Sequence, residues 1–245
     1  MRVYDSPKLS KQAASKTALV HHCYHCKCFQ IQTLGKYTAD GTSIKAGPAT
    51  SSAGLRCTSC DGPTLVGGPF YAAPMHQPEF LARMLDHIAH KHTYGTWDRM
   101  AGMLAVISEE LPDLFSHCMA KWCHTLRITS PTRAHFVSAL LNSGYSCSGT
   151  HTKATSIKTN APANVIWKVV LAYCVSIGKE LPATAEPLRL SAEKGDVDFT
   201  PSKLAVPGSV SSKMVRFQCN PQPYWGPQSR PARQNEHQDK KQRSE

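Results

Sequence analysis

The stretch "HHCYHCKCFQ" (residues 21–30) places three cysteines and three histidines within eight positions. It could be a metal site, a disulfide knot or a reactive thiol centre. Cys23 and Cys26 are spaced C-x2-C, and Cys57 and Cys60 repeat that spacing further along the chain. Each C-x2-C turn aims two thiolates at one point, and two such turns close a tetrahedral zinc site. With no open position, such a site is structural and not catalytic.

The disulfide alternative depends on the compartment. The first residues, "MRVYDSPKLSKQAASK", contain no apolar segment of signal-peptide length. The longest apolar stretch, "VIWKVVLAYCVSI" (165–177), includes Lys168 and is too short to span a bilayer. We therefore expect no membrane partner and a reducing compartment, where the ten cysteines stay free of disulfides. The remaining alternative to zinc is free cysteines that share a spacing by chance.

The other cysteines receive different interpretations. Cys28 follows Cys26 by two positions, and we expect alternation to turn it away from the site. Cys28, His22 and His25 are spare potential ligands. Free cysteine behaves as a small apolar residue, so Cys118, Cys123 and Cys174, in or beside helical stretches, are expected in the core.

The chain divides into four zones of an α+β fold. Residues 1–19 begin with a short strand-like piece, "MRVY", and then turn polar, and residues 20–75 form a small zinc-knuckle region. The middle of that region, "GKYTADGTSIKAGPATSSAGLR" (35–56), is predicted to be a flexible loop of small residues. Residues 76–178 form a mostly helical domain. Residues 179–245 are rich in Pro, Ser, Gln and charge, and we expect a largely disordered basic tail.

Helical periodicity in the third zone predicts five helices, over 78–90, about 97–110, about 116–126, from an N-cap at Ser130 to Gly144, and about 162–177. The third and fourth helices are joined by only a few residues, which favours a helix-turn-helix. The segment 145–162 is rich in Thr and Ser and suits a two-stranded wing. The pattern thus predicts a winged-helix-like domain, and an ordinary helical bundle with a polar loop is the alternative.

Charge points to an anionic partner. The chain has 28 Lys and Arg against 17 Asp and Glu, a formal charge of +11, which favours nucleic acid. The first predicted contact is Arg133, in the fourth predicted helix. The wing would contribute His151, Lys153 and Lys158, and the tail would contribute Arg216, Trp225, Arg230 and Arg233. The rival interpretation is solvated surface charge, with the tail aromatics docked on their own domain.

Several catalytic patterns are absent from the sequence. No Gly-rich loop follows a strand and opens a helix, no G-x-S-x-G occurs, and "HIAHKH" (87–92) lacks a metalloprotease pattern. No carboxylate pair stands out. We therefore predict no catalytic residue.

Five blocks carry a resemblance to a known family. They are "RVYDSPKLSKQAASKTALVHHCYHC", "CTSCDGPTLVGGPFYAAPMHQPEFLARML", "ISEELPDL", "SPTRAHFVSALLNSGYSCSGTHTKATSIKTNAPANVIWKVV" and "VRFQCNPQPYWGP". In this order they resemble the C-terminal part of the tRNA guanine-N2 dimethyltransferases that modify guanosine 26. The resemblance covers roughly residues 1–233.

The resemblance implies an enzyme that uses S-adenosylmethionine to methylate the exocyclic amine of a guanine in tRNA. In that family a Rossmann-like domain comes first and holds the methyl donor, while the C-terminal domain carries zinc cysteines and helps to bind tRNA. Cys23, Cys26, Cys57 and Cys60 fall on the family's cysteine positions. The resemblance also implies that residues 1–19 are a remnant of the end of the catalytic domain, with "MRVY" as the tail of its last stretch. No donor-binding half is matched, so we expect S-adenosylmethionine not to bind this chain and the chain alone to be inactive.

Two smaller departures are Phe70-Tyr71, where a pair with Trp is more usual, and His76-Gln77 in place of His-Asp. The leading hypothesis is a tRNA-binding C-terminal portion that works with a missing catalytic domain in cis. The alternatives are a stand-alone zinc-containing nucleic-acid-binding module and a DNA-binding winged helix. The family allows nuclear, cytoplasmic or mitochondrial localisation, and "KKQR" in the tail favours the nucleus. The sequence leaves the oligomeric state open.

Overall fold

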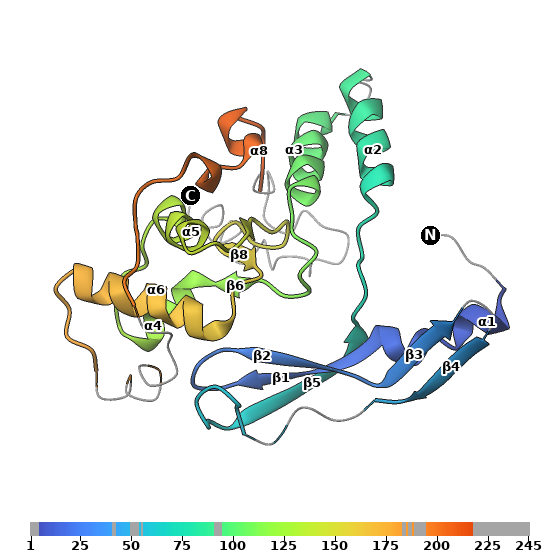
Figure 1. Ribbon diagram of the computed structural model, residues 1–245. Coiled ribbons are helices and arrows are strands. Elements are labelled where there is room, and N and C mark those ends of the chain that lie inside the picture. Colours follow the sequence, from blue (N-terminus) through green and yellow to red (C-terminus); the bar gives the residue numbers. More distant parts are fainter. Residues whose placement is uncertain are drawn as a thin grey trace, which may run out of the picture.

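The computed structural model describes residues 5–40, 43–49, 54, 56–90, 95–182, 185, 188 and 195–217. The fold is α+β, as predicted. A β-rich part, built from the first third of the chain, lies below a group of helices in Figure 1. Because residues 1–4 and 218–245 lie outside the described residues, three of the predicted nucleic-acid contacts do too: Trp225, Arg230 and Arg233.

The β-rich part contains a three-stranded antiparallel sheet of order β2-β1-β5 and a separate hairpin of β3 and β4. β1 is the central strand, and the predicted domain boundary after residue 19 falls inside it. The elements are α1 (Pro7–Ser10), η1 (Ala13–Lys16), β1 (Thr17–Cys23), β2 (Phe29–Thr33), β3 (Gly35–Asp40), β4 (Ser43–Pro48) and β5 (Thr64–Tyr71).

The β3–β4 hairpin corrects the prediction of a loop over residues 35–56. Its register runs from Gly35 opposite Pro48 to Asp40 opposite Ser43, so backbone hydrogen bonds define it. A prediction based on apolar residues misses such a hairpin, because this segment has little apolar surface to bury.

The helical part confirms the five predicted helices, with ends shifted by a few residues. The fourth begins later than expected: Thr132, not Ser130, is the N-cap, and its hydroxyl accepts a hydrogen bond from the His135 backbone N–H at 3.3 Å. The elements are α2 (Pro78–His90), α3 (Trp97–Ser108), β6 (His117–Cys118), α4 (Met119–Thr125), α5 (Arg133–Asn142), β7 (Cys147–Ser148), β8 (Ser156–Thr159) and α6 (Ala163–Ser176).

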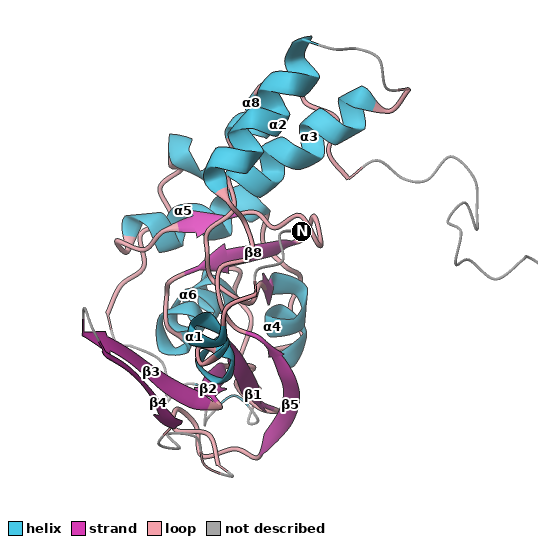
Figure 2. Cartoon of the chain, turned by 90° about the vertical axis from the view of Figure 1, so that its right-hand side faces the viewer, coloured by secondary structure: helices cyan, strands magenta, loops and turns pink. Residues whose placement is uncertain are grey.

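The main core lies between α4, α5, α6 and β8. Its largest fully buried side chains include Trp167, Phe136, Leu140 and Ile157. Helices α2 and α3 pack on each other and project away from the β1–β2–β5 sheet, with α4 and α6 in between (Figures 1 and 2). The three short strands form a sheet of order β6-β8-β7.

Part of the predicted tail is ordered. Residues 195–217 include η3 (Lys203–Ala205) and α8 (Gly208–Ser211). This segment runs along α5, where the Ser202 N–H donates to the Ser138 hydroxyl at 2.9 Å. It then reaches α3, where a side chain at Gly102 would collide with the Val215 carbonyl. No helix in the described part of the chain is long and apolar enough to cross a membrane.

Candidate metal centre and basic surface

The two C-x2-C segments have the same local structure. In each, the backbone N–H of the first cysteine donates to a carbonyl five residues later at 2.8 Å, from Cys23 to Cys28 and from Cys57 to Gly62. The residue after the second cysteine has a left-handed backbone in both segments, with φ near +55°; these residues are Lys27 (56°) and Asp61 (54°). Two equivalent knuckles therefore face one another, as the repeated spacing predicts.

The four sulfurs of Cys23, Cys26, Cys57 and Cys60 lie within 4.8 Å of one another. Across the two knuckles, Cys23 Sγ lies 3.5 Å from Cys60 Sγ, and Cys26 Sγ lies 3.5 Å from Cys57 Sγ. A tetrahedron with Zn–S bonds of about 2.3 Å has edges of about 3.8 Å. This all-thiol donor set therefore fits zinc. The cysteines of the described residues are all free of disulfides.

Cys28 does not turn away from the cluster, contrary to the expectation from alternation. Its Sγ lies 3.1 Å from that of Cys26 and 3.2 Å from that of Cys57, and the residue is buried. The reason is that residues 24–26 form a turn, so strand alternation does not hold there. Cys28 is a fifth thiol at the edge of the four-cysteine site.

Burial and hydrogen bonds among the thiols shift their pKa values. The hydrogen bond with Cys28, followed by burial, raises the pKa of the Cys26 thiol. Burial also acts to raise the pKa of Cys57, but hydrogen bonds from Cys28 and from the Ser59 and Cys60 backbone outweigh it and bring this pKa to about 6. A divalent cation at the centre would favour the thiolate form of every ligand.

The knuckles are fastened to the helical domain through Trp167 of α6. Its indole N–H donates to the Cys26 carbonyl at 2.8 Å, and the ring is fully buried. Trp122 of α4 packs against it, with ring centroids 4.9 Å apart. The cysteine cluster and the helical core thus form one continuous buried unit.

A second polar cluster centres on Glu110, just after α3. Its carboxylate is fully buried; Oε1 lies 2.9 Å from Lys158 Nζ, and Oε2 lies 2.6 Å from His151 Nδ1. The His151 backbone N–H and the Thr150 hydroxyl also donate to this carboxylate, both at 3.0 Å. Burial raises the pKa of Glu110, but the hydrogen bonds from His151 and Lys158 and the Lys158 charge outweigh it and bring the pKa to about 2.

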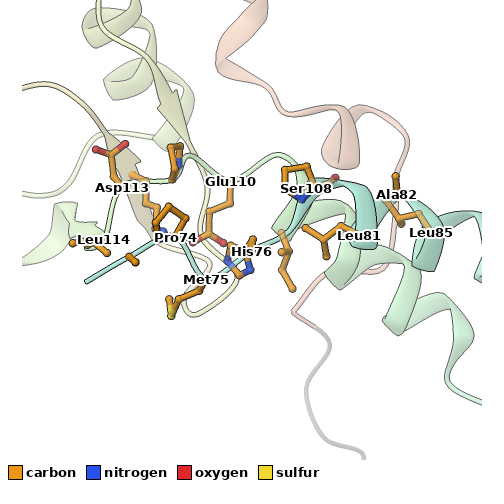
Figure 3. Close-up of a pocket in the computed structure, with 15 residues that line it drawn as sticks. Pro74, Met75, His76, Leu81, Ala82, Leu85, Ser108, Glu110, Asp113 and Leu114 are labelled. Carbon is orange, nitrogen blue, oxygen red and sulfur yellow. Dashed lines mark ion pairs between the residues drawn. The ribbon is translucent and has the colours of Figure 1, made fainter. Parts of the chain in front are cut away.

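His76 extends this cluster toward a pocket of about 350 Å³ between residues 73–85 and residues 107–114. In Figure 3, His76 lies beside Glu110 at the polar end of a mainly apolar wall. Ligand atoms of His76, Glu110 and His151 lie within 4.8 Å of one another. However, Lys158 already neutralises the carboxylate, and its ammonium repels a second cation. This arrangement favours a structural ion network over a metal site.

The predicted nucleic-acid contacts occupy different settings. Lys158 is only 7% exposed and His151 30% exposed, and both are paired with Glu110, while Lys153 is exposed. Arg133 and Arg216 both line a pocket of about 250 Å³ that also contains Glu109. Burial, followed by the Arg216 charge, lowers the pKa of Arg133. The structure therefore brings together His151 with Lys158 and Arg133 with Arg216, as two separate pairs.

Comparison with known proteins identifies the family. The model of the family "N2,N2-dimethylguanosine tRNA methyltransferase" matches residues 1–171, which include both knuckles and most of the helical part. The chain belongs to this family.

Curated members of the family extend the match toward the C-terminus. The chain is 36% identical over 251 residues to the tRNA (guanine(26)-N(2))-dimethyltransferase of Schizosaccharomyces pombe, covering 95% of this chain and 44% of that protein. It is 32% identical to the Homo sapiens enzyme, with 94% and 36% covered. The chain thus spans less than half the length of these relatives.

A solved structure supports the fold. Trm1 from Pyrococcus horikoshii, determined with S-adenosyl-L-methionine, matches 67% of this chain and 38% of its own, with a TM-score of 0.50 and 18% identity. At this identity the likeness concerns the fold alone.

Three residues of the site were not predicted in these roles: Glu110, Trp167 and Cys28. Glu110 belongs to the block "ISEELPDL", and only its partners far along the chain give it a role. Trp167 carries no local signal for a contact with Cys26. For Cys28, the crowding of three cysteines between residues 23 and 28 was the available signal.

Proposed function

We propose that this chain is the tRNA-binding, C-terminal portion of a tRNA (guanine-26-N2)-dimethyltransferase. The observation that carries the proposal is the family match over residues 1–171, because it includes both knuckles and the core that joins them. The enzyme would transfer a methyl group from S-adenosylmethionine to the exocyclic amine of a guanine. This chain would bind and orient tRNA, while donor binding would need the part of the relatives that it does not match.

We propose structural zinc as the role of Cys23, Cys26, Cys57 and Cys60. Support comes from the all-thiol donor set and from two matching knuckles, in which the Cys26 N–H donates to Cys23 Sγ and the Ser59 N–H to Cys57 Sγ, each at 3.4 Å. Four thiolates leave no position for substrate, so the metal would hold the fold and take no part in methyl transfer.

The helical domain is proposed to be a winged helix. The order β6, α4, α5, β7, β8, with β8 between β6 and β7 in the sheet, supports this assignment. A DNA-reading winged helix must insert its recognition helix into a groove. Here α5 is the equivalent helix; residues 136–140 are buried, and the segment that includes Ser202 packs on it. This arrangement favours tRNA over duplex DNA as the partner.

Family membership also weighs against the alternative of a stand-alone zinc-containing nucleic-acid-binding module. The nuclear assignment stays a prediction, since "KKQR" lies outside the described residues. The family also has a mitochondrial member: the chain is 31% identical to the mitochondrial tRNA (guanine(26)-N(2))-dimethyltransferase of Saccharomyces cerevisiae.

The proposal is tested by equilibrium binding of the full chain to a tRNA transcript and to duplex DNA of equal phosphate number, at one salt concentration. Matched salt is essential because phosphate contacts make affinity steeply salt-dependent. We expect tRNA to bind at least about tenfold more tightly. Tighter binding of the duplex would overturn the proposal.

A methyl-transfer assay tests whether this chain can transfer the methyl group without a separate donor-binding part. The chain is incubated with labelled S-adenosylmethionine and tRNA, with a full-length family enzyme as the positive control. We expect no transfer by this chain alone, because the donor and the amine must be held in line at reacting distance. Transfer at a rate similar to the control would show that the chain holds its own donor site.

A further inference from the structure

A groove of about 890 Å³ lies where the cysteine region (residues 17–71) meets the helical region (residues 78–176). The turn between β1 and β2 forms one wall, and α4 with the segment before it forms the other (Figure 1). This volume is in the range of clefts that hold small ligands, roughly 300–1,000 Å³. Its lining includes Tyr24, Lys27, Phe29, His117, Lys121 and Lys153.

The groove is positively charged. Lys27, Lys121 and Lys153 line it, and the residues that form its walls include no Asp or Glu. Lys121 lies in α4 and Lys153 in the connection between β7 and β8, and both side chains are exposed. These three ammonium groups line one space and make it complementary to an anion.

The groove also presents an aromatic ring to solvent. Tyr24 is 62% exposed, and the Lys27 ammonium lies 4.6 Å from the centre of its ring. Also in the lining, the rings of Phe29 and His117 stack with centroids 5.1 Å apart and an angle of 20° between their planes. Burial lowers the pKa of His117 to about 4, so this ring is neutral at physiological pH. An exposed ring among cations is the combination that binds unpaired bases and their phosphates.

We propose that this groove binds an unpaired segment of tRNA, with phosphates at Lys121 and Lys153 and one base stacked on Tyr24. A single strand fits better than a duplex, because a base inside a helix has no free face for Tyr24. The inference rests on the proposed function and adds the place where the RNA is held. Lys158 has no part in it, because that ammonium is buried against Glu110.

The first experiment compares two charge-reversal pairs in the full chain. Lys121→Glu with Lys153→Glu changes the groove, and Lys45→Glu with Lys203→Glu makes the same charge change at exposed positions outside it. Binding of tRNA is measured from 50 to 200 mM salt. We expect the groove pair to lose about tenfold or more in affinity and to lower the salt slope by about 1.4, and the control pair to change the affinity less than about threefold.

The second experiment separates stacking from charge at Tyr24. We expect Tyr24→Ala to weaken tRNA binding on the order of tenfold, while Tyr24→Phe, which keeps the ring, binds like the parent. Zinc content and circular dichroism are measured on each variant, because Tyr24 lies between two metal-ligand candidates.

The outcomes distinguish this inference from the proposed function. If the parent binds tRNA and the groove variants bind as tightly as the control pair, the groove is not the RNA site, and an acidic protein surface becomes its candidate occupant. An equal loss in both pairs means nonspecific attraction and also overturns the proposal. If the parent binds no tRNA at low salt, the proposed function fails together with the groove.

Discussion

The cysteine region and the helical region bury different kinds of residue. Among the described residues of 17–71, the buried apolar side chains are Ala18 and four cysteines, while Leu65, Val66 and Tyr71 are more than half exposed. The helical region buries Trp167, Phe136 and a set of branched aliphatic residues. Apolar burial contributes about 25 cal/mol per Å², so the second region has a core of its own. The first depends on its thiol cluster.

Removal of zinc should have the largest effect and should separate the two regions. Binding of a structural zinc ion contributes on the order of 10 kcal/mol of folding free energy. With a strong chelator, or in Cys57→Ser, we expect the amides of β1, β2 and β5 to lose protection from hydrogen exchange. The amides of α5 and α6 should keep most of theirs.

Hydrogen exchange followed by mass spectrometry checks this prediction region by region. Equal loss of protection in both regions would mean that they have no separate sources of stability. Unchanged protection and melting temperature after chelation would contradict the zinc site.

The next largest effect should come from Glu110→Gln, which acts on the helical side. It leaves the Lys158 ammonium buried without its counter-charge, and we expect unfolding to become easier by about 3–5 kcal/mol. The matched control is Glu180→Gln, an exposed carboxylate whose replacement should cost less than about 0.5 kcal/mol.

Urea unfolding of zinc-loaded protein measures both variants. Replacing both partners with Met should restore most of the lost stability, because a buried ion pair can be exchanged for apolar packing. An effect of Glu110→Gln as small as that of the control would mean that the network is unimportant.

Acid should weaken the helical region through the same carboxylate. The folded pKa of Glu110, about 2, lies below the ordinary glutamate value of 4.5, so its contribution is complete above pH 4.5 and is lost as pH falls toward 2. The difference corresponds to about 3 kcal/mol. Unfolding free energies at pH 5 and pH 3, measured with chelator present, should fall by less in Glu110→Gln than in the parent. Parallel curves would disprove the assignment.

The smallest effect concerns the contact that joins the regions. Trp167→Phe removes the donor to the Cys26 carbonyl, and we expect a loss of about 1–3 kcal/mol in the zinc-loaded chain. In the zinc-free chain the loss should shrink, because that carbonyl is no longer held in place. Trp122→Phe, a neighbouring indole-to-phenyl change, is the control. A loss that does not depend on zinc would place the effect in the helical core alone.

The sequence predicted those features that repeat locally. Helical periodicity located α2 to α6, and two identical spacings brought Cys23, Cys26, Cys57 and Cys60 together. It did not predict features that the spacing of apolar residues does not record. The β3–β4 hairpin is defined by backbone hydrogen bonds, the position of Cys28 by a local turn, and the role of Glu110 by donors 40 and 41 positions further along the chain, Thr150 and His151.

The basic groove could not be predicted, because its walls come from four separated parts of the chain: residues 20–29, Leu65, residues 115–125 and Lys153. Lys153 was predicted as a contact from the wing pattern, whereas Tyr24 and Lys121 carry no such signal in their own neighbourhoods. Only the packing of α4 against the β1–β2 side brings these residues to one surface.

The hydrogen bond from Trp167 to Cys26 also has a consequence for timing during synthesis. Its partners are 141 residues apart, and a ribosome adds about 5–20 residues per second. A new chain therefore completes its first knuckle on the order of ten seconds before Trp167 exists. During that interval the Cys26 carbonyl faces water, and only local turns and metal can order the thiols. Metal capture by the growing chain would come first, and docking of the last helix would come after it.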